Sequence, residues 1–342
     1  MNNKSNRIEW VDIARGIALV FVLLTHCYHV RVEFCFWFYS FMMATFFVLS
    51  GYTFKTALSY KEFFRHKIYT LLIPYVFMAA VCIVFWGGLA VTHGNSYNIM
   101  NELAKYTVQI RHTALWFLPC LFLAEQIMYV ICYQIKKKAC LNVVYLYDFL
   151  LFFCLYFIYL KFIGIRLPWN ADLSILAIAF MLLGKYLNHS EGLENKKICF
   201  LGGMISFIIG YINYRYFSYI DWFDDKFGNP VLFCICSVSG VVSVIGASKI
   251  LENKKCKLKK VIIYLGKNSM IYYGLHRCVL EMIYVIYYKI GLNLEINSVL
   301  ALIMAFVAMV ITCLLLTPVN EIILRFLPWC IGKTIIEKEK HD

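Results

Sequence analysis

Charged and imidazole side chains are spaced along one apolar segment near the N-terminus of the chain. Asp12 and Arg15 lie at its start, and His26 and His29 lie near its end. On a helix with 100° per residue, Arg15 and His26 share a face to within about 20° and are about 16 Å apart along the axis, and Asp12 is about 40° from His26. A neutral imidazole there can take a proton from a hydroxyl group, because its unperturbed pKa lies near 6.5. The structural alternative is a buried ion pair between Asp12 and Arg15, with His26 bonded to a neighbouring backbone.

A second segment, near residue 270, also combines imidazole and hydroxyl groups. Ser269 and His276 are seven residues apart, so they lie within about 20° on one helical face, with Tyr272 between them. We expect His276 either to be a second acid or base or to bond only within the bundle, and we expect Ser269 and Tyr272 to orient or support the reacting groups. Hydroxyl side chains in apolar helices also join helices to one another, which is the structural alternative for Ser269 and Tyr272.

The composition indicates which kind of element must position these side chains. Of the 342 residues, 62% are hydrophobic and only 15% are charged, whereas about a quarter of the residues of a soluble chain are charged. A soluble globular protein is therefore excluded, and the chain must use lipid as its solvent. The formal net charge of +13 is accompanied by no RRM, zinc-finger or helix-turn-helix pattern, so we expect no nucleic-acid partner.

Apolar runs long enough to cross a bilayer follow one another along nearly the whole chain. They predict an all-α, polytopic transmembrane bundle of about ten helices, near residues 12–30, 35–54, 69–91, 114–135, 141–160, 171–188, 198–219, 231–249, 262–288 and 297–319. Lysines and arginines concentrate in every second connection, which places both termini in the cytoplasm. We expect a single membrane domain over residues 1–342, with a short cytoplasmic N-terminus (1–11) and a C-terminal tail (320–342).

Further polar clusters lie at the expected ends of these helices. Ser50 ends the second helix at the inner face, and Arg65 and Lys67 follow in a cytoplasmic loop that either grips phosphates or anchors the topology. Trp116 opens the fourth helix on the outer side, where an indole suits both sugar stacking and the interfacial aromatic belt. The external acidic run 221–225 loosely resembles a diphosphate-binding motif, but it occurs once, and we expect a solvated loop.

Three acidic residues, Glu125, Asp148 and Asp172, fall inside apolar runs and need partners there. Carboxylates at this depth can relay protons or bind cations, so a polytopic transporter of a small polar or glycan-related solute is an alternative function. The 14 cysteines lie mostly in apolar runs and include no C-x-x-C pair. We therefore expect them to act as small hydrophobic side chains, and we expect no metal site.

Taken in order, these segments resemble the acyltransferase 3 family of bacterial integral-membrane O-acyltransferases. Within that family the chain is similar to the branch of fucose 4-O-acetylase and exopolysaccharide O-acetyltransferases, and the resemblance runs nearly end to end. The positions that carry it are Arg7 with Asp12, Arg15, Gly16 and His26; Phe46 to Tyr52; Leu72 to Tyr75; Leu115 to Pro119; Phe180 to Gly184; and Gly266 to His276.

The resemblance implies an enzyme that takes an acetyl or longer acyl group from cytoplasmic acyl-CoA. The acceptor is a hydroxyl of an extracytoplasmic or lipid-linked cell-surface carbohydrate, as in exopolysaccharide biosynthesis. Acetyl-CoA is then a donor substrate, no cofactor stays bound, and the protein is a multi-pass component of the bacterial cytoplasmic membrane. The histidine and arginine that are essential in the first helix of the family correspond to His26 and Arg15.

The resemblance also suggests a role for each polar group of the first helix. We expect His26 to deprotonate the acceptor hydroxyl, and an acetyl-histidine relay is the mechanistic rival. Arg15 would hold a CoA phosphate or stabilise the developing oxyanion, and Asp12 would orient Arg15.

The remaining site residues are expected to bind the two substrates. Ser50, Arg65 and Lys67 are predicted to bind acyl-CoA, although this chain has Arg65-His66-Lys67-Ile68 where some members of the family carry R-x-x-R. Trp116 and His29 are predicted to bind the acceptor. A non-catalytic membrane scaffold is a third possible function besides acyl transfer and transport.

Overall fold

The computed structural model describes residues 8–27, 32–56, 58–135, 141–188, 190, 193–292 and 299–333. Within these ranges the chain is helical, and the only β pairing is an isolated bridge between Asp221 and Lys226. The α-helices are α1 (Glu9–Thr25), α2 (Val32–Tyr52), α3 (Tyr60–Lys67), α4 (Ile73–Thr92), α5 (Ile99–Val108), α6 (Phe117–Ile135), α7 (Leu141–Phe162), α8 (Ala171–Asn188), α9 (Lys196–Tyr216), α10 (Pro230–Glu252), α11 (Lys257–Lys267), α12 (Ser269–Lys289) and α13 (Val299–Phe326). The predicted all-α fold is confirmed.

Eight helical segments of the described chain are long and apolar enough to cross a membrane. They are residues 35–52, 60–92, 114–134, 142–162, 168–188, 196–216, 230–252 and 299–326. Two of the ten predicted spans, α1 and α12, are not among the eight, because α1 has only 17 residues and α12 carries charged side chains. The chain is a polytopic helical bundle and a multi-pass membrane protein.

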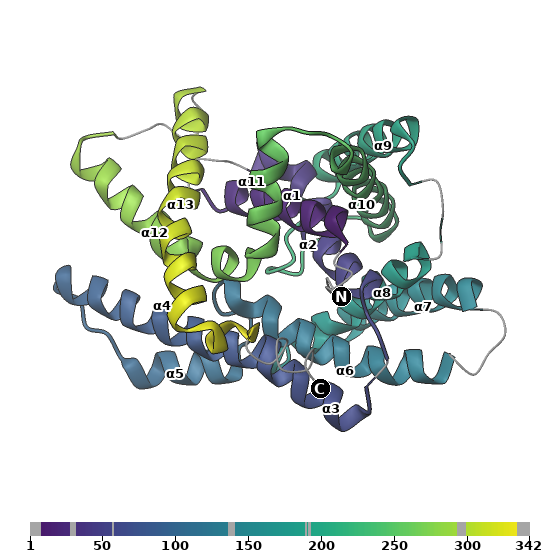
Figure 1. Cartoon of the computed structure of the whole chain (residues 1–342), viewed down its shortest axis with the longest axis horizontal. Helices are drawn as coiled ribbons and strands as arrows, with labels where there is room; N and C mark the ends of the chain where they lie inside the picture. The colour runs from purple at the N-terminus through teal and green to yellow at the C-terminus, as the bar shows by residue number, and fades with distance from the viewer. Residues whose placement is uncertain are drawn as a thin grey trace, which may run out of the picture.

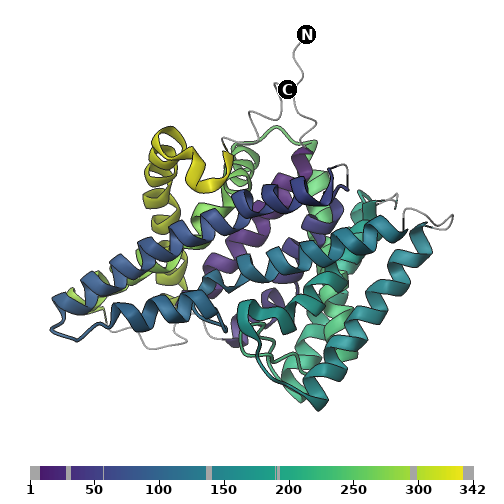
Figure 2. The ribbon, with the colours of Figure 1, turned by 90° about the horizontal axis from the view of Figure 1, so that it is seen from below.

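The helices form three groups that are visible from two directions. In Figure 1, α4, α5, α12 and α13 gather at one end, α7 to α10 gather at the other, and α1, α2 and α11 lie between them. The same grouping is visible after a quarter turn (Figure 2). Helix α1 contacts α2, α10, α11 and α12. Because α1 is central, its side chains face neighbouring helices rather than lipid.

Glycines allow the central helices to approach one another closely. A Cβ atom built on Gly51 of α2 would lie 1.9 Å from the carbonyl oxygen of Met181 in α8. A Cβ atom on Gly266 of α11 would lie 1.8 Å from the carbonyl oxygen of Asp12 in α1. Larger residues at these two glycines would force the helices apart, and the second contact fixes the end of α11 against the start of α1.

The predicted single helix over 262–288 is wrong, because the structure breaks it at Asn268. Gly266 lies near the end of α11, and the Asn268 side chain donates to the carbonyl oxygen of Tyr264 at 3.0 Å. A side-chain amide that bonds locally to the backbone competes with helix continuation. The break turns the chain, so that α12 starts at Ser269.

The connection between the predicted spans 69–91 and 114–135 contains a further helix, α5, which the apolar pattern did not predict. This helix folds back along α4, so that the Tyr97 ring packs on Gly87 and the Tyr75 hydroxyl donates to the carbonyl oxygen of Tyr106. Helices α3 and α4 form one continuous run from Tyr60 to Thr92, joined by a π-helical turn at 68–72.

The connections that the charge pattern places inside meet at one end of the bundle. The backbone amide of Trp10 donates to the Glu252 carboxylate at 3.2 Å, which joins the start of α1 to the end of α10. Lys185, near the end of α8, donates to the carbonyl oxygen of Phe54, which follows α2.

The connections expected outside also meet one another. Segments 109–116, 163–172 and 217–229 are joined at the beginning of α8, which is the end opposite to Lys185. This arrangement agrees with the alternation of inside and outside connections that the sequence predicts.

Candidate functional site

Two histidines from different helices form the centre of the site. His26 caps the end of α1, and His276 lies in α12. Their ring centroids are 4.7 Å apart and the rings meet edge to face at 81°. The eleven-residue spacing of Arg15 and His26 and the seven-residue spacing of Ser269 and His276 predict each ring on a helical face. The structure brings the two faces together where α1 and α12 contact each other.

Backbone hydrogen bonds determine which nitrogen of each ring carries the proton. The Nδ1 atom of His26 is 2.8 Å from the carbonyl oxygen of Val22, and the Nδ1 atom of His276 is 2.8 Å from the carbonyl oxygen of Tyr273. A carbonyl oxygen only accepts, so Nδ1 carries the hydrogen and Nε2 of each neutral ring keeps its lone pair. The Nε2 atom of His276 is buried without a hydrogen-bond partner in the described chain. Both rings are therefore prepared to accept a proton.

His26 lines a cavity of about 330 Å³, which we call the outer cavity. Its wall combines aromatic, hydroxyl and charged side chains, including Tyr39, Thr113, Trp116, Asp221, Phe223, Tyr273 and Arg277. Such a mixture of apolar surface and a few convergent polar groups is typical of a small-ligand site.

The roof of the outer cavity comes from the loop between α9 and α10. In this loop the backbone amide of Phe223 donates to Asp221 at 2.8 Å, and the Asp221–Lys226 bridge closes a short hairpin. Trp222 is only 2% exposed. Burial raises the pKa of the Asp221 carboxyl group, although the Phe223 amide opposes this shift. The expectation of a solvated loop at 221–225 is wrong, because its aromatic residues pack into the bundle.

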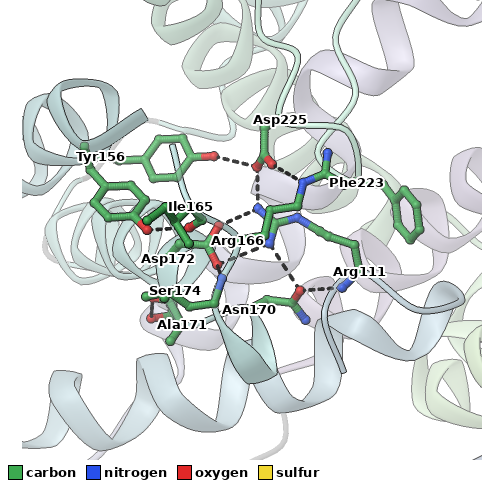
Figure 3. Close-up of polar contacts among 12 residues, drawn as sticks. Arg111, Tyr156, Ile165, Arg166, Asn170, Ala171, Asp172, Ser174, Phe223 and Asp225 are labelled. Atoms are coloured by element: carbon green, nitrogen blue, oxygen red, sulfur yellow. Dashed lines mark hydrogen bonds and ion pairs between the residues drawn. The ribbon is translucent and has the colours of Figure 1, made fainter. Parts of the chain in front are cut away.

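A network of buried charges holds the roof in place (Figure 3). Arg111 donates to both oxygens of Asp172, at 3.2 and 2.7 Å, and also contacts Asp225. Tyr156 and Arg166 each donate to Asp225 at 3.0 Å. Burial opposes the charged form of Arg111, but the two carboxylates outweigh it and raise its pKa. The network ties the loops before α6, before α8 and before α10 into one unit.

The backbone of this unit is strained in a way that no helix pattern predicts. Non-glycine residues with positive φ gather here, namely Gln109, Arg111, Thr113, Trp169, Asn170 and Asp225. For a β-branched residue such as Thr113, a φ of +56° is unfavourable. Strain of this kind persists only where the surrounding contacts over-determine it, and it often marks functional sites.

A second cavity of about 400 Å³, which we call the vestibule, lies beside the first. Its wall contains Arg15, His66, Lys67, Lys267 and Lys333 as cationic or imidazole side chains, together with Ser50, Glu125, Phe117, Asn268, Ser269 and Tyr273. Lys67 and Glu125 form an ion pair at 2.9 Å. Lys333 donates to Asn268 at 3.2 Å, so the chain after α13 completes the wall. Basic groups outnumber acidic ones, which suits a polyanion.

The structure distributes the predicted site residues between these two cavities. Arg15, Ser50, Lys67 and Ser269 line the vestibule. His26 and Trp116 line the outer cavity. Arg15 and His26 therefore lie in separate cavities, although they share a helical face. His276 is fully buried against His26.

Three other predicted residues, Arg65, Tyr272 and Asp12, line neither cavity. Arg65 is exposed and stacks over the Tyr69 ring at 5.8 Å, and the Tyr272 hydroxyl is 2.9 Å from Thr317 Oγ1. Asp12 is buried in α1, with 1% exposure. His29 lies outside the described residues.

Sequence reasoning missed several residues of the site. Asp221 belongs to a loop that looks solvated, Lys333 looks like a topology signal, and Lys267 falls inside the predicted span 262–288. Tyr273 and Arg277 lie in the α12 motif, but the helical wheel gave no reason to prefer them to Tyr272. The expectation that carboxylates in apolar runs need partners did identify Glu125 and Asp172. Glu125 pairs with Lys67, and Asp172 pairs with Arg111.

Neither a metal centre nor a disulfide emerges from the described ranges. No group of three or more His, Cys, Asp or Glu side chains there is arranged to hold a metal ion. The cysteines of the same ranges are free thiols, and most are buried.

Comparison with known proteins identifies the family. A protein-family model for an acyltransferase domain, that of acyltransferase 3, matches residues 8–318. Neither the curated proteins nor the solved structures gave a match. The matched region includes α1 with His26, α12 with His276, and nearly all of both cavities. The chain therefore belongs to the acyltransferase 3 family of membrane proteins.

Proposed function

We propose that the protein transfers an acetyl group from acetyl-CoA in the vestibule to a carbohydrate hydroxyl in the outer cavity. The observation that carries this proposal is the position of His26. Its Nδ1 atom donates to the Val22 carbonyl oxygen, so the lone pair of Nε2 can accept a proton. Its ring lines the outer cavity, which lies next to the vestibule and its basic groups. A hydroxyl acceptor and a polyanionic donor need these two environments side by side.

The charge of the vestibule supports acyl-CoA as the donor. Arg15, Lys267 and Lys333 contribute cationic groups that can bind the phosphates of CoA. Lys67 is paired with Glu125 at 2.9 Å, so it reaches a phosphate only by leaving that carboxylate. Its predicted binding of a phosphate therefore requires this ion pair to open.

The wall of the outer cavity supports a carbohydrate acceptor. Trp116 and Tyr39 offer ring surfaces on which the apolar face of a sugar can stack, and Asp221 and Arg277 offer an acceptor and a donor for sugar hydroxyls. The carbohydrate is extracytoplasmic or lipid-linked, and the protein lies in the bacterial cytoplasmic membrane with both termini inside.

The chemical step follows from the histidine pair. His26 Nε2 takes the proton of the acceptor hydroxyl as the oxygen attacks the thioester carbonyl carbon. The carbon–sulfur bond breaks, an ester forms, and the CoA thiolate takes up the proton to leave as the thiol. His276, in edge contact with His26, is positioned to share the positive charge that develops on the imidazole. Acetyl transfer to His26 itself remains the rival first step.

The transporter alternative loses much of its support. It rested on buried acidic residues in search of a ligand, yet Glu125 is paired with Lys67 and Asp172 with Arg111. Carboxylates that are neutralised by basic side chains are not open cation sites.

The test is NMR of base-labile O-acetyl groups on the surface glycan of cells lacking this gene. The cells are complemented with the wild type, His26→Ala or His93→Ala at matched membrane levels. His93 follows α4 on the exposed surface, so it controls for loss of an imidazole. Acetyl signals restored by the wild type and His93→Ala alone support the proposal and identify the sugar. Restoration by His26→Ala removes His26 from the mechanism, and restoration by none of the three contradicts O-acetyl transfer to that glycan.

A further inference from the structure

One side chain forms part of the wall of both cavities. Among the described residues, Tyr273 is the only one that lines the vestibule and the outer cavity. Its ring is 6% exposed and lies between Phe117, which faces the vestibule, and His276, with centroid distances of 5.6 and 6.2 Å. The Tyr273 side chain is thus the partition between the cationic compartment and the histidine compartment.

A hydrogen bond fixes this ring to the turn that precedes α6. The Tyr273 hydroxyl donates to the carbonyl oxygen of Ala114. In this turn, residues Ala114 and Trp116 face the outer cavity and Phe117 faces the vestibule, so the turn forms the rest of the partition.

The Arg111 network holds this turn in place. Asn170 donates to the carbonyl oxygen of Trp116 at 3.2 Å, and the same side chain accepts from the backbone amide of Arg111 at 3.0 Å. Figure 3 shows Asn170 beside Arg111, whose guanidinium also donates to Asp172. The ring of Tyr273 therefore packs against a rigid turn. Rotation of the Tyr273 side chain is then the simplest way to open the partition.

Acyl transfer requires the partition to open. The thioester carbon must come within about 3.5 Å of the attacking oxygen, which His26 activates in the outer cavity. The cations that can bind the CoA phosphates lie on the other side of Tyr273. We propose that Tyr273 is a positioning residue that separates donor from acceptor and admits the acetyl thioester to His26 only when its ring leaves Ala114. This inference rests on the proposed function.

A closed partition also protects the donor from water. If water took the place of the acceptor, His26 Nε2 would accept its proton while its oxygen attacked the thioester carbon. The carbon–sulfur bond would break, and acetate and CoA thiol would form. Keeping the thioester out of a hydrated cavity until an acceptor arrives prevents this loss.

The experiment compares variants of the full-length protein in lipid nanodiscs. Tyr273→Ala removes the ring, and Tyr273→Phe keeps the ring but removes the bond to Ala114. The matched control is Tyr287→Phe, since Tyr287 is a buried tyrosine of the same helix whose hydroxyl donates to the carbonyl oxygen of Met304 and which lines neither cavity. Release of CoA thiol from acetyl-CoA is measured alone and with de-O-acetylated surface glycan from the cells described above.

We expect the ratio of hydrolysis to transfer to rise with the opening of the partition. Tyr273→Ala should release thiol without acceptor about tenfold faster than the wild type, which corresponds to about 1.4 kcal/mol of barrier. Tyr273→Phe should show a smaller rise, and Tyr287→Phe should match the wild type. A purely structural role would lower hydrolysis and transfer together, so an unchanged ratio in a folded Tyr273→Ala protein overturns the inference.

A second measurement does not depend on the acceptor. Protein is reconstituted into vesicles of phosphatidylethanolamine and phosphatidylglycerol that contain the pH indicator pyranine. Joining the two cavities should create a path for water and protons in Tyr273→Ala but not in Tyr287→Phe, so proton leak should rise only in the former. Equal leak in both contradicts the partition, whereas a leak from Tyr273→Ala beside a wild type that transfers no acetyl group contradicts the proposed function alone.

Discussion

The vestibule and the outer cavity lie on either side of Tyr273 but are built in opposite ways. The vestibule is lined by long basic side chains from separate elements, such as Lys67, Lys267 and Lys333. The outer cavity has balanced charge, with Asp221 and Arg277 in its wall, and a roof fixed by buried ion pairs.

The difference matches what each compartment must do. Long, flexible cations adapt to a large polyanion and contribute binding without precise geometry. A roof held by Arg111 and by left-handed backbone positions such as that of Thr113 keeps its shape, as the orientation of a hydroxyl beside His26 requires. Substitutions in the outer cavity should therefore affect the chemical step, and those in the vestibule should affect donor binding.

The largest expected effect is on the chemical step. His26→Ala should lower kcat for acetyl transfer by about 10²–10⁴-fold, the usual contribution of a positioned general base, and should leave KM for acetyl-CoA nearly unchanged. Steady-state kinetics of the purified protein measure both constants. A large rise in KM with normal kcat would reverse the assignment of the two compartments.

The next effect concerns the roof of the outer cavity. Arg111→Met should lower the free energy of unfolding by about 3–5 kcal/mol, because it leaves Asp172 and Asp225 as buried carboxylates without their shared partner. The control is Arg166→Gln, whose side chain also pairs with Asp225 but is 40% exposed, and we expect a loss below about 1 kcal/mol. Thermal unfolding in detergent compares the two. Equal losses would mean that burial of Arg111 does not rigidify the roof.

Sequence patterns predicted the membrane bundle well because lipid imposes a strong rule on composition. Apolar runs located eight spans, and the helical spacing brought His26 and His276 onto faces that do meet. The break at Asn268 was not predictable in the same way, because apolar periodicity continues across it and the close contact of Gly266 with Asp12 is a tertiary feature.

The division into two cavities was also beyond the reach of the sequence. A helical wheel places Arg15 and His26 on one face but contains no information about what separates them. Tyr272 and Tyr273 are neighbours of the same type, and only the packing of α12 directs one into the cavities and the other toward Thr317. The roof escaped notice because an acidic loop signals solvent exposure unless a distant residue, here Arg111, neutralises it.

A smaller effect is expected in the vestibule. Lys267→Gln should raise KM for acetyl-CoA about three- to tenfold with little change in kcat, since one charge-assisted bond to a phosphate is lost. Because Lys267 is exposed, the effect should shrink at high ionic strength. Lys260→Gln is the control, as it lies on the same helix outside the vestibule. The same rise in KM for both variants would indicate a general surface potential rather than a binding site.

The smallest effect tests the hairpin of the roof through pH. Burial raises the pKa of the Asp221 carboxyl above its value in the unfolded chain, about 3.9. The protonated form therefore favours the fold, so its contribution to stability is complete below about pH 4 and is lost as the pH rises through the folded pKa. Asp221→Asn cannot titrate, and its amide oxygen can still accept from Phe223.

Between pH 4.5 and pH 7.5, we expect the Tm of Asp221→Asn to rise by about one to two degrees relative to the Tm of the wild type. Asp224→Asn controls for the loss of a charge from the same loop, where its carboxylate is 41% exposed. The other titrating groups are common to both proteins and cancel in the difference. If the Tm difference stayed constant or fell with rising pH, Asp221 would be a well-solvated carboxylate, and the roof would be as adaptable as the vestibule.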